Sequence, residues 1–287
     1  MTSRILRLSL IIVAAIGAGS AGVSRAQSDD APAEQLLNSP FVLDAGLFVL
    51  GQNTKANLNG QGVDNPEVDF NKTFGSGADA RRFRLDGLWR ITKRQHLEFM
   101  YFTNSISRTK EIPEDDPLKW GDYQFSGSVT AKTRLSIYEL GYEYAFVRNQ
   151  TLEIAGSFGI HYTKATLDLS GNATVIGPGG EVTQVTGATK EGSVPAPLPV
   201  IGLRAGWAFA GNWLLEGQVQ IFDFSYDGFH GNWSDFRAGV IYMFNQHVGV
   251  GAGYDNFSTH LSLNQSNFDG HLNLGYNGGL IYIRGAL

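Results

Sequence analysis

The sequence contains no cysteine, so a disulfide framework, a cysteine nucleophile and a Cys-ligated metal are all excluded. Charged residues make up only 17% of the 287 residues, which excludes a chain kept disordered by its own charge. After residue 26 no apolar run is long enough to form a membrane helix. The composition indicates a folded chain whose 36 glycines suit tightly turned β-structure better than long helices.

The first 26 residues have the organisation of a secretory signal peptide. Arg4 and Arg7 precede an apolar run from Leu8 to Ala18, and small residues, Ser24 and Ala26, occupy the −3 and −1 positions of a cleavage site. The apolar core is too short for a stable membrane anchor, the alternative interpretation. This segment holds three arginines and no acid, so its removal makes the chain more acidic than its net charge of −5. An acidic chain without basic clusters argues against a nucleic-acid partner.

A polar segment, 27–40, leads into a region where apolar and polar residues alternate almost throughout. In one stretch Phe83 and Trp89 alternate with Arg84 and Asp86. Because side chains of a strand point alternately to its two faces, this period predicts strands with one apolar and one polar face.

About ten such segments can be counted, with eight and twelve as the neighbouring possibilities. Their approximate limits are 41–52, 81–91, 95–107, 131–147, 151–168, 197–209, 213–226, 233–244, 248–261 and 271–283. Most are longer than an ordinary globular strand of about 5–6 residues, and they meet the roughly 9–11 residues that a tilted membrane strand needs.

The links between these segments alternate between long and short. Long, polar, Gly-rich links are expected at 53–80, 108–130, 169–196, 227–232 and 262–270. Keeping the apolar residues of consecutive strands on one face requires odd turns, and three-residue turns are expected at 92–94, 148–150, 210–212 and 245–247. Short turns at one rim and long loops at the other are typical of outer-membrane barrels. Residues 174–183 look like an extra hairpin within the third long loop.

Aromatic residues gather beside the short turns and the C-terminus, on the apolar face of their strands. This predicted aromatic girdle consists of Trp89, Tyr144, Phe146, Trp207, Phe209, Trp213, Tyr242, Phe244 and Tyr282. Amphipathic rings prefer the depth of the membrane–water interface, so the pattern favours a transmembrane barrel. A soluble β-sandwich, the alternative, would not collect its aromatics at one end of every strand.

The signal peptide, the alternating strands, the aromatic-ended hairpins and the closing strand from His271 to Leu287 resemble small Gram-negative outer-membrane barrels of the OmpA-like and OmpW-like kind. The chain ends on Arg284 to Leu287 where such barrels commonly end on an aromatic residue, and no room follows for a peptidoglycan-binding domain. The resemblance implies one antiparallel, up-and-down barrel over 41–287, in the outer membrane, with periplasmic termini and five extracellular loops. Expected partners are outer-membrane lipid, lipopolysaccharide and, during biogenesis, the barrel-assembly machinery.

The polar face of the strands then fills the lumen. The predicted lumen charge network consists of Arg82, Arg84, Asp86, Arg90, Glu98, Glu139, Glu143, Glu153, Arg204, Glu216, Asp235 and Arg237. Asp44, His161, Gln218, Gln220 and Asp255 share this inward phase. An isolated charge in a low-dielectric interior is costly, so these groups are expected to form a paired plug. The alternative is a narrow, cation-preferring passage beside the bare wall of Gly249, Gly251 and Gly253.

Catalysis is not expected. His161, His230, His260 and His271 lie near the outer strand ends, but no spacing repeats a barrel-enzyme signature, and none of them is paired at a metal-ligand spacing. We therefore expect no catalytic residues, no metal and no cofactor. The leading hypothesis is a non-enzymatic barrel with a structural or surface role and at most porin-like passage of small solutes. The alternatives are a rim hydrolase acting on lipid or peptide, and a channel for hydrophobic compounds or cations.

Overall fold

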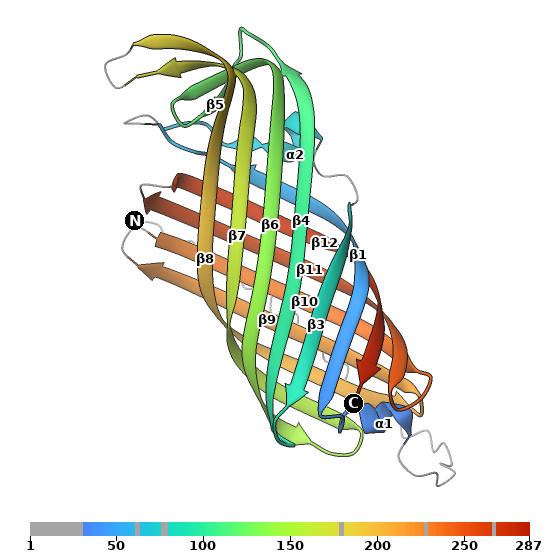
Figure 1. Ribbon diagram of the computed structural model, residues 1–287. Helices are drawn as coiled ribbons and strands as arrows, with labels where there is room; N and C mark the ends of the chain where they lie inside the picture. The colour runs from blue at the N-terminus through green and yellow to red at the C-terminus, as the bar shows by residue number, and fades with distance from the viewer. Residues whose placement is uncertain (1–30, 61–63, 76–79, 178–180, 227–228, 266–267) are drawn as a thin grey trace, which may run out of the picture.

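A closed barrel of ten antiparallel strands forms the body of the molecule (Figure 1). The computed structural model describes residues 31–60, 64–75, 80–177, 181–226, 229–265 and 268–287, and the predicted signal peptide lies outside them. The up-and-down barrel expected from the sequence is confirmed. No helix among the described residues is long and apolar enough to cross a membrane.

The elements follow one another along the chain with few interruptions. They are α1 (Pro32–Leu36), β1 (Phe41–Ala56), β2 (Val68–Asp69), α2 (Phe70–Phe74), β3 (Ala80–Arg90), β4 (Gln95–Ile112), β5 (Leu118–Trp120), β6 (Tyr123–Arg148), β7 (Leu152–Ile176), β8 (Val182–Ala210), β9 (Trp213–Tyr226), β10 (Phe229–Met243), β11 (Val248–Gln265) and β12 (Phe268–Ala286).

Each strand of the ring pairs with its chain neighbours, and the last strand pairs with the first. The β12–β1 register runs from the pair Val42 and Ala286 to the pair Ala56 and Leu272. The short strands β2 and β5 lie off this ring and pair with β1 and β6. Closure leaves no sheet edge within the ring itself, which is the condition for a sheet to cross lipid. Beyond the ring, β8 before Ile201 and β4 after Phe102 are paired on one side only.

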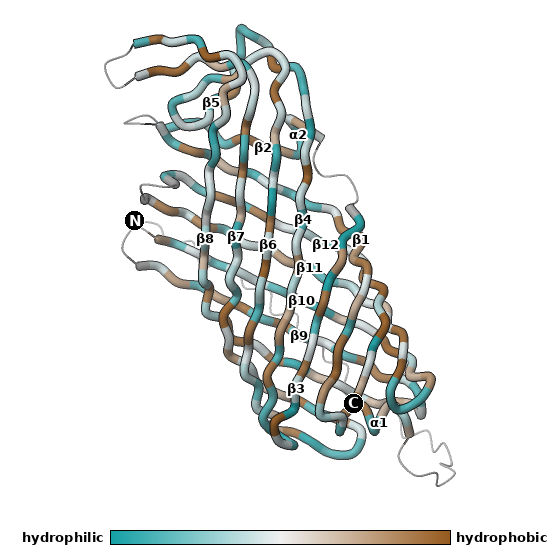
Figure 2. The backbone as a smooth tube through the Cα atoms, viewed as in Figure 1, coloured by the Kyte–Doolittle hydropathy of each residue, from teal (hydrophilic) through white to brown (hydrophobic). Residues whose placement is uncertain are grey.

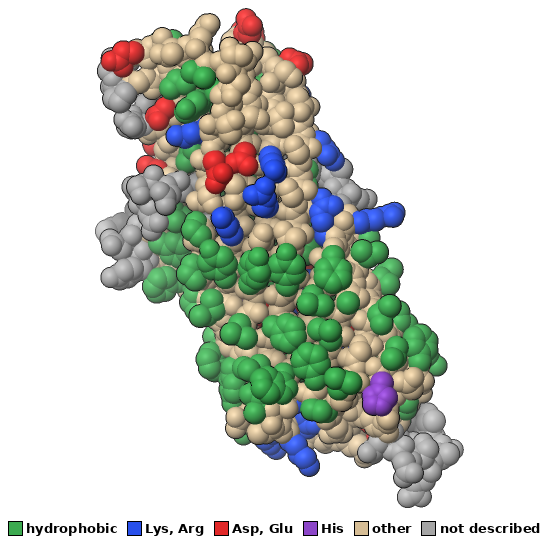
Figure 3. All heavy atoms as spheres, viewed as in Figure 1, with side chains coloured by type: hydrophobic (Ala, Val, Ile, Leu, Met, Phe, Trp, Pro, Cys, Tyr) green, Lys and Arg blue, Asp and Glu red, His purple; other side chains and the backbone are tan. Residues whose placement is uncertain are grey.

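Apolar and polar residues alternate along the strands (Figure 2), and the alternation separates an exposed apolar face from an inward face that carries most of the charges. On β6, Tyr138 and Leu140 are 49% and 62% exposed, whereas Glu139 and Glu143 are buried. Exposed apolar side chains form a broad belt around the end of the barrel that carries α1, and charged side chains appear directly above it (Figure 3). An apolar belt facing outward around a polar lumen is the arrangement of transmembrane barrels.

Four strands extend far beyond the belt. The links expected at 108–130 and 169–196 consist largely of strand, because β4 continues to Ile112 and β6, β7 and β8 lengthen toward the same end (Figure 1). The expected separate hairpin at 174–183 is the end of the β7–β8 pairing, which reaches Ile176 and Val182. Buried Val129, Leu167 and Leu169 line the inside of this extension and stabilise it.

The strands beside the short turns keep the expected phase, but three of the four turns do not have the expected three residues. Trp89 faces Leu97 across the β3–β4 turn, as the phasing requires. Only the β6–β7 link has three residues outside strands; the other links are 91–94, 211–212 and 244–247. Bulges between Ala145 and Val147 and between Ala208 and Ala210 restore the phase.

Candidate functional site: the barrel lumen

Helix α1 closes the short-turn end of the barrel. Its apolar side chains join a cluster made of Ala33, Leu36, Leu37, Val42, Ala208, Leu214, Ile241, Met243, Tyr282 and Ala286. Two arginines of the wall hold the segment that follows the helix. Arg90 donates to the Ser39 carbonyl at 2.9 Å, and Arg148 donates to the Leu37 carbonyl at 2.7 Å. This segment is therefore bound to the barrel by both apolar packing and charge-assisted hydrogen bonds.

Next to α1 lies an ionic group that we call the Arg204 cluster. Its members are Arg90, His96, Glu143, Arg148, Glu153 and Arg204. Arg204 Nη2 lies 2.7 Å from Glu143 Oε2 and 2.8 Å from Glu153 Oε1, and both carboxylates are 0% exposed. A buried carboxylate needs a partner for its charge, and the guanidinium of Arg204 provides it for both Glu143 and Glu153.

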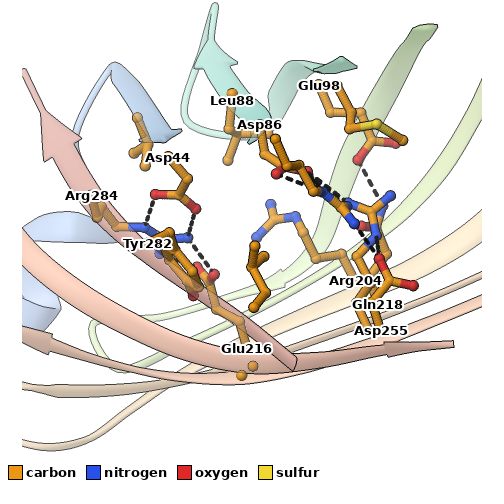
Figure 4. Close-up of a pocket in the computed structure, with 18 of the residues that line it drawn as sticks. Asp44, Asp86, Leu88, Glu98, Arg204, Glu216, Gln218, Asp255, Tyr282 and Arg284 are labelled. Carbon is orange, nitrogen blue, oxygen red and sulfur yellow. Dashed lines mark hydrogen bonds and ion pairs between the residues drawn. The ribbon is translucent and has the colours of Figure 1, made fainter. Parts of the chain in front are cut away.

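A smaller group lies on β1, β9 and β12. Arg284 places its guanidinium between two carboxylates, 2.6 Å from Asp44 Oδ2 and 2.7 Å from Glu216 Oε2, as Figure 4 shows. The same guanidinium lies 5.6 Å from the ring centre of Tyr282. This Arg284 triad ties the closing strand to the opposite wall of the lumen.

Further from α1 lies the Arg237 cluster. Its members are Arg84, Asp86, Glu139, Asp235, Arg237 and Asp255. Arg237 lies 3.0 Å from both Asp86 and Glu139, and Arg84 contacts Asp86 at 2.9 Å. Four acids around two arginines make this region acidic, yet each of these carboxylates has a cationic neighbour.

Glu98 is the exception among the inward-facing carboxylates of the described residues. It is held by amides instead, accepting from Gln218 at 2.7 Å and from Gln220 at 3.1 Å. Gly141 allows its side chain to lie against β6, since a Cβ there would meet Glu98 Oε1 at 2.5 Å.

A cavity of about 140 Å³ lies between these ionic groups. Its lining includes Asp44, Arg84, Glu98, Arg204, Glu216 and Arg237. The space is large enough for water, and the charged side chains in its lining offer hydrogen-bonding partners. Leu36 of α1 lines one side of it.

Those rings form an aromatic layer across the lumen beyond the Arg237 cluster, made of Phe48, Phe102, Trp233, Phe257 and Tyr276. Phe48 meets Phe102 and Tyr276 edge-on at 5.7 and 5.5 Å, and Tyr276 stacks on Phe257 at 4.6 Å between centroids. A further apolar contact, Phe70 of α2 against Trp120, lies toward the end of the barrel opposite α1 (Figure 1). Ionic clusters and aromatic side chains thus occupy successive levels of the lumen.

Most of the predicted network is inward and paired. Arg82 does not join it, because its guanidinium binds Asn104 at 2.6 Å and the Ser105 carbonyl. The prediction omitted His96, Arg148 and Arg284. His96 shares the even phase of Glu98 and could have been found, whereas Arg148 follows a bulge that no pattern reveals.

The prediction that Tyr282 belongs to the aromatic girdle is wrong. The other eight predicted rings face outward, but Tyr282 is 7% exposed and points into the lumen, while Ile281 and Ile283 face outward. Its ring occupies the space over Gly251, where a Cβ would lie 2.2 Å from the ring. The expected bare wall of glycines is therefore partly filled by this tyrosine.

The four histidines considered for catalysis separate in space. His161 is buried in the lumen, with Nε2 3.0 Å from Glu139 and its ring against Trp233. His230, His260 and His271 lie together on β10–β12, with neighbouring ring centroids 6.0 and 6.4 Å apart. The described part of the chain holds no group of three or more His, Asp or Glu placed to bind a metal ion.

The outer membrane protease OmpT from Escherichia coli has the same fold, with a TM-score of 0.54 and 11% identity over 86% of this chain and 96% of that chain. The P. putida toluene transporter TodX gives a TM-score of 0.37 at 10% identity, covering 90% and 92%. Neisserial surface protein A gives 0.32 at 12% identity, covering 87% and 98%.

The likeness to OmpT establishes the class of fold, a small β-barrel of the outer-membrane type. No protein-family model matches the chain, and no curated protein matches it. The finer resemblance to the OmpA-like and OmpW-like kind stays a prediction.

Proposed function

We propose that this chain is a non-enzymatic barrel of the Gram-negative outer membrane, closed to solutes, that serves envelope integrity and contact at the cell surface. The observation that carries the proposal is the filled lumen: α1, the ionic clusters and the aromatic layer follow one another along the barrel axis. We propose that α1 and the C-terminus lie on the periplasmic side and that the extended ends of β4, β6, β7 and β8 are extracellular.

The extended sheet supports a role at the surface. It projects beyond the apolar belt, and its exposed positions carry Ser, Thr and charged residues, such as Ser107, Thr109 and Glu191 (Figure 3). Long, solvated strands above the membrane are suited to contact with other molecules, since binding residues concentrate on segments held out by a rigid scaffold.

Single-channel conductance of the refolded barrel in a planar bilayer tests the closed lumen. We expect no current steps from protein whose folding is shown by its unboiled gel mobility. A variant lacking residues 27–39 and carrying Phe48→Ala and Tyr276→Ala is expected to conduct, because it removes the seal at one end and opens the aromatic layer. Stable cation-selective steps from the unmodified barrel, reduced by Glu139→Gln or Glu143→Gln, would instead identify a pore.

One contact favours a second candidate, the rim hydrolase. Ser225 Oγ lies 2.6 Å from His230 Nδ1, which is the distance required between a nucleophile and its base. We expect no turnover when folded barrel is incubated with lipopolysaccharide or a peptide pool, since no carboxylate is seen to orient His230 among the described residues. Turnover abolished by Ser225→Ala and by His230→Ala, but not by Ser234→Ala, would establish the hydrolase.

A further inference from the structure

The basic residues of the barrel are distributed unevenly around its circumference. After Arg204 the sequence holds just two, Arg237 and Arg284, and both point into the lumen. The outer surface of β9–β12 therefore carries no lysine or arginine. Any lysine or arginine on the outside of the barrel wall must therefore lie in the other half of the barrel, β1–β8.

Three basic residues of β6 and β7 lie directly beyond the belt, and we call them the basic patch: Lys132, Arg134 and Lys164. The register pairs Ser136 with Lys164 and Arg134 with Thr166, so the patch spans the outward face of β6 and β7. Arg134 and Lys164 are exposed and Lys132 is half-buried. Figure 3 shows charged side chains gathered in this zone, immediately above the apolar belt.

A row of tyrosines marks the edge of the belt beneath the patch. The rings of Tyr101, Tyr138 and Tyr162 lie side by side on β4, β6 and β7, with centroids 5.2 and 6.3 Å apart. Lys164 is two residues beyond Tyr162 and Arg134 is four beyond Tyr138, which is roughly 7 and 13 Å along a strand. Tyrosine rings favour the interface between acyl chains and headgroups, so the patch lies at headgroup depth.

None of the three side chains of the patch forms an ion pair among the described residues. Two carboxylates are near: Asp168 faces Lys132 across β6–β7, and Glu191 faces Asp168 across β7–β8. Both lie further from the belt than Arg134 and Lys164, so the part nearest the membrane is positive.

We infer that Lys132, Arg134 and Lys164 bind the phosphate groups of a glycolipid headgroup of the lipopolysaccharide type, with its acyl chains against the tyrosine row. This inference rests on the proposed outer-membrane location and names the lipid that the barrel would hold. Guanidinium and ammonium groups at headgroup depth complement phosphate, and the outer surface of β9–β12, which has no lysine or arginine, offers no equivalent site.

Lipid retention measured by native mass spectrometry tests the site. Purified barrel is mixed with bisphosphorylated lipid A or with the same lipid after removal of its phosphates. We expect the unmodified barrel to prefer the phosphorylated lipid, and Lys132→Gln/Arg134→Gln/Lys164→Gln to weaken its retention at least about tenfold, because each basic group near an anionic surface contributes on this scale. The matched control, Arg108→Gln/Lys110→Gln/Lys119→Gln, removes the same charge from exposed positions further from the belt and is expected to retain the lipid.

Equal retention of both lipids, or equal loss in patch and control variants, would overturn the inference. Inorganic phosphate in excess should leave the lipid bound; its release would indicate a site for free phosphate instead. Folding is checked by unboiled gel mobility, and the three single substitutions replace the triple variant if it fails to fold. Because the assay is independent of conductance, its failure is distinguishable from failure of the closed-barrel proposal.

Discussion

Replacing Arg204 with methionine is expected to lower the free energy of unfolding by about 3–5 kcal/mol, the usual cost of leaving a buried carboxylate without its partner. Arg204 is the principal cation of Glu143, to which it makes hydrogen bonds of 2.7–3.0 Å. Once it is removed, Glu143 keeps only His96, at 3.3 Å. Glu153 is less affected, since Arg90 and Arg148 remain beside it. The measurement is a urea titration of the barrel in lipid vesicles, read by gel mobility and tryptophan fluorescence.

Two variants separate charge pairing from other effects of the substitution. Arg108→Met removes an exposed arginine that bonds only to its neighbouring carbonyl, and should stay within about 0.5 kcal/mol of the unmodified protein. Adding Glu143→Gln to Arg204→Met should recover part of the loss, because the buried charge that needed a partner is gone. An Arg204→Met barrel as stable as the control would mean that water, and not Arg204, compensates Glu143.

Replacing Phe48 with alanine is expected to cost about 3–5 kcal/mol, as for other fully buried aromatic side chains. Phe48 is 0% exposed and touches two other rings of the aromatic layer, Phe102 and Tyr276, with the Arg84 guanidinium 5.8 Å from its centre. Alanine leaves a void that the rigid wall of a closed barrel cannot collapse around. The loss is read as a lower urea midpoint at an unchanged slope.

Val182→Ala is the matched control for this cavity. Val182 is 68% exposed at the end of the extended sheet, beyond the belt, and its truncation should change stability by no more than about 0.5 kcal/mol. A Phe48→Ala loss below 1 kcal/mol would show that the aromatic layer is loosely packed or wet. The description of the lumen as sealed would then be wrong.

Large stability losses are expected at buried lumenal positions and small ones at exposed positions, because no disulfide contributes to the stability of this chain. With no cysteine, the chain is held by ladder hydrogen bonds and by the side chains packed in the lumen. The wall positions of β3, β6 and β8 therefore carry stability through their inward charges, while the extended ends of β6–β8 are free to vary in sequence.

Much of the fold could be predicted because strand alternation is a local property. The opposite faces of Tyr138 and Glu139 follow from period two alone, and the ten-strand count follows from repeated turns and apolar faces. The prediction failed on β12, where the side chains that face the lumen are also apolar. Leu272, Leu274 and Tyr276 point into the aromatic layer. Tyr282 has the same phase and therefore also points inward, although it was predicted to face outward.

The sequence by itself determined the class of fold, the number of strands and the inward phase of most charges, since these depend on the spacing of neighbouring residues. Only the tertiary structure decided which charges pair, because Arg204 and Glu143 are 61 positions apart and meet across a curved wall. It also decided that the lumen is filled, since α1, Tyr282 and the aromatic layer come from distant segments. Barrel closure brings these parts together, and no local pattern encodes the register at which it closes.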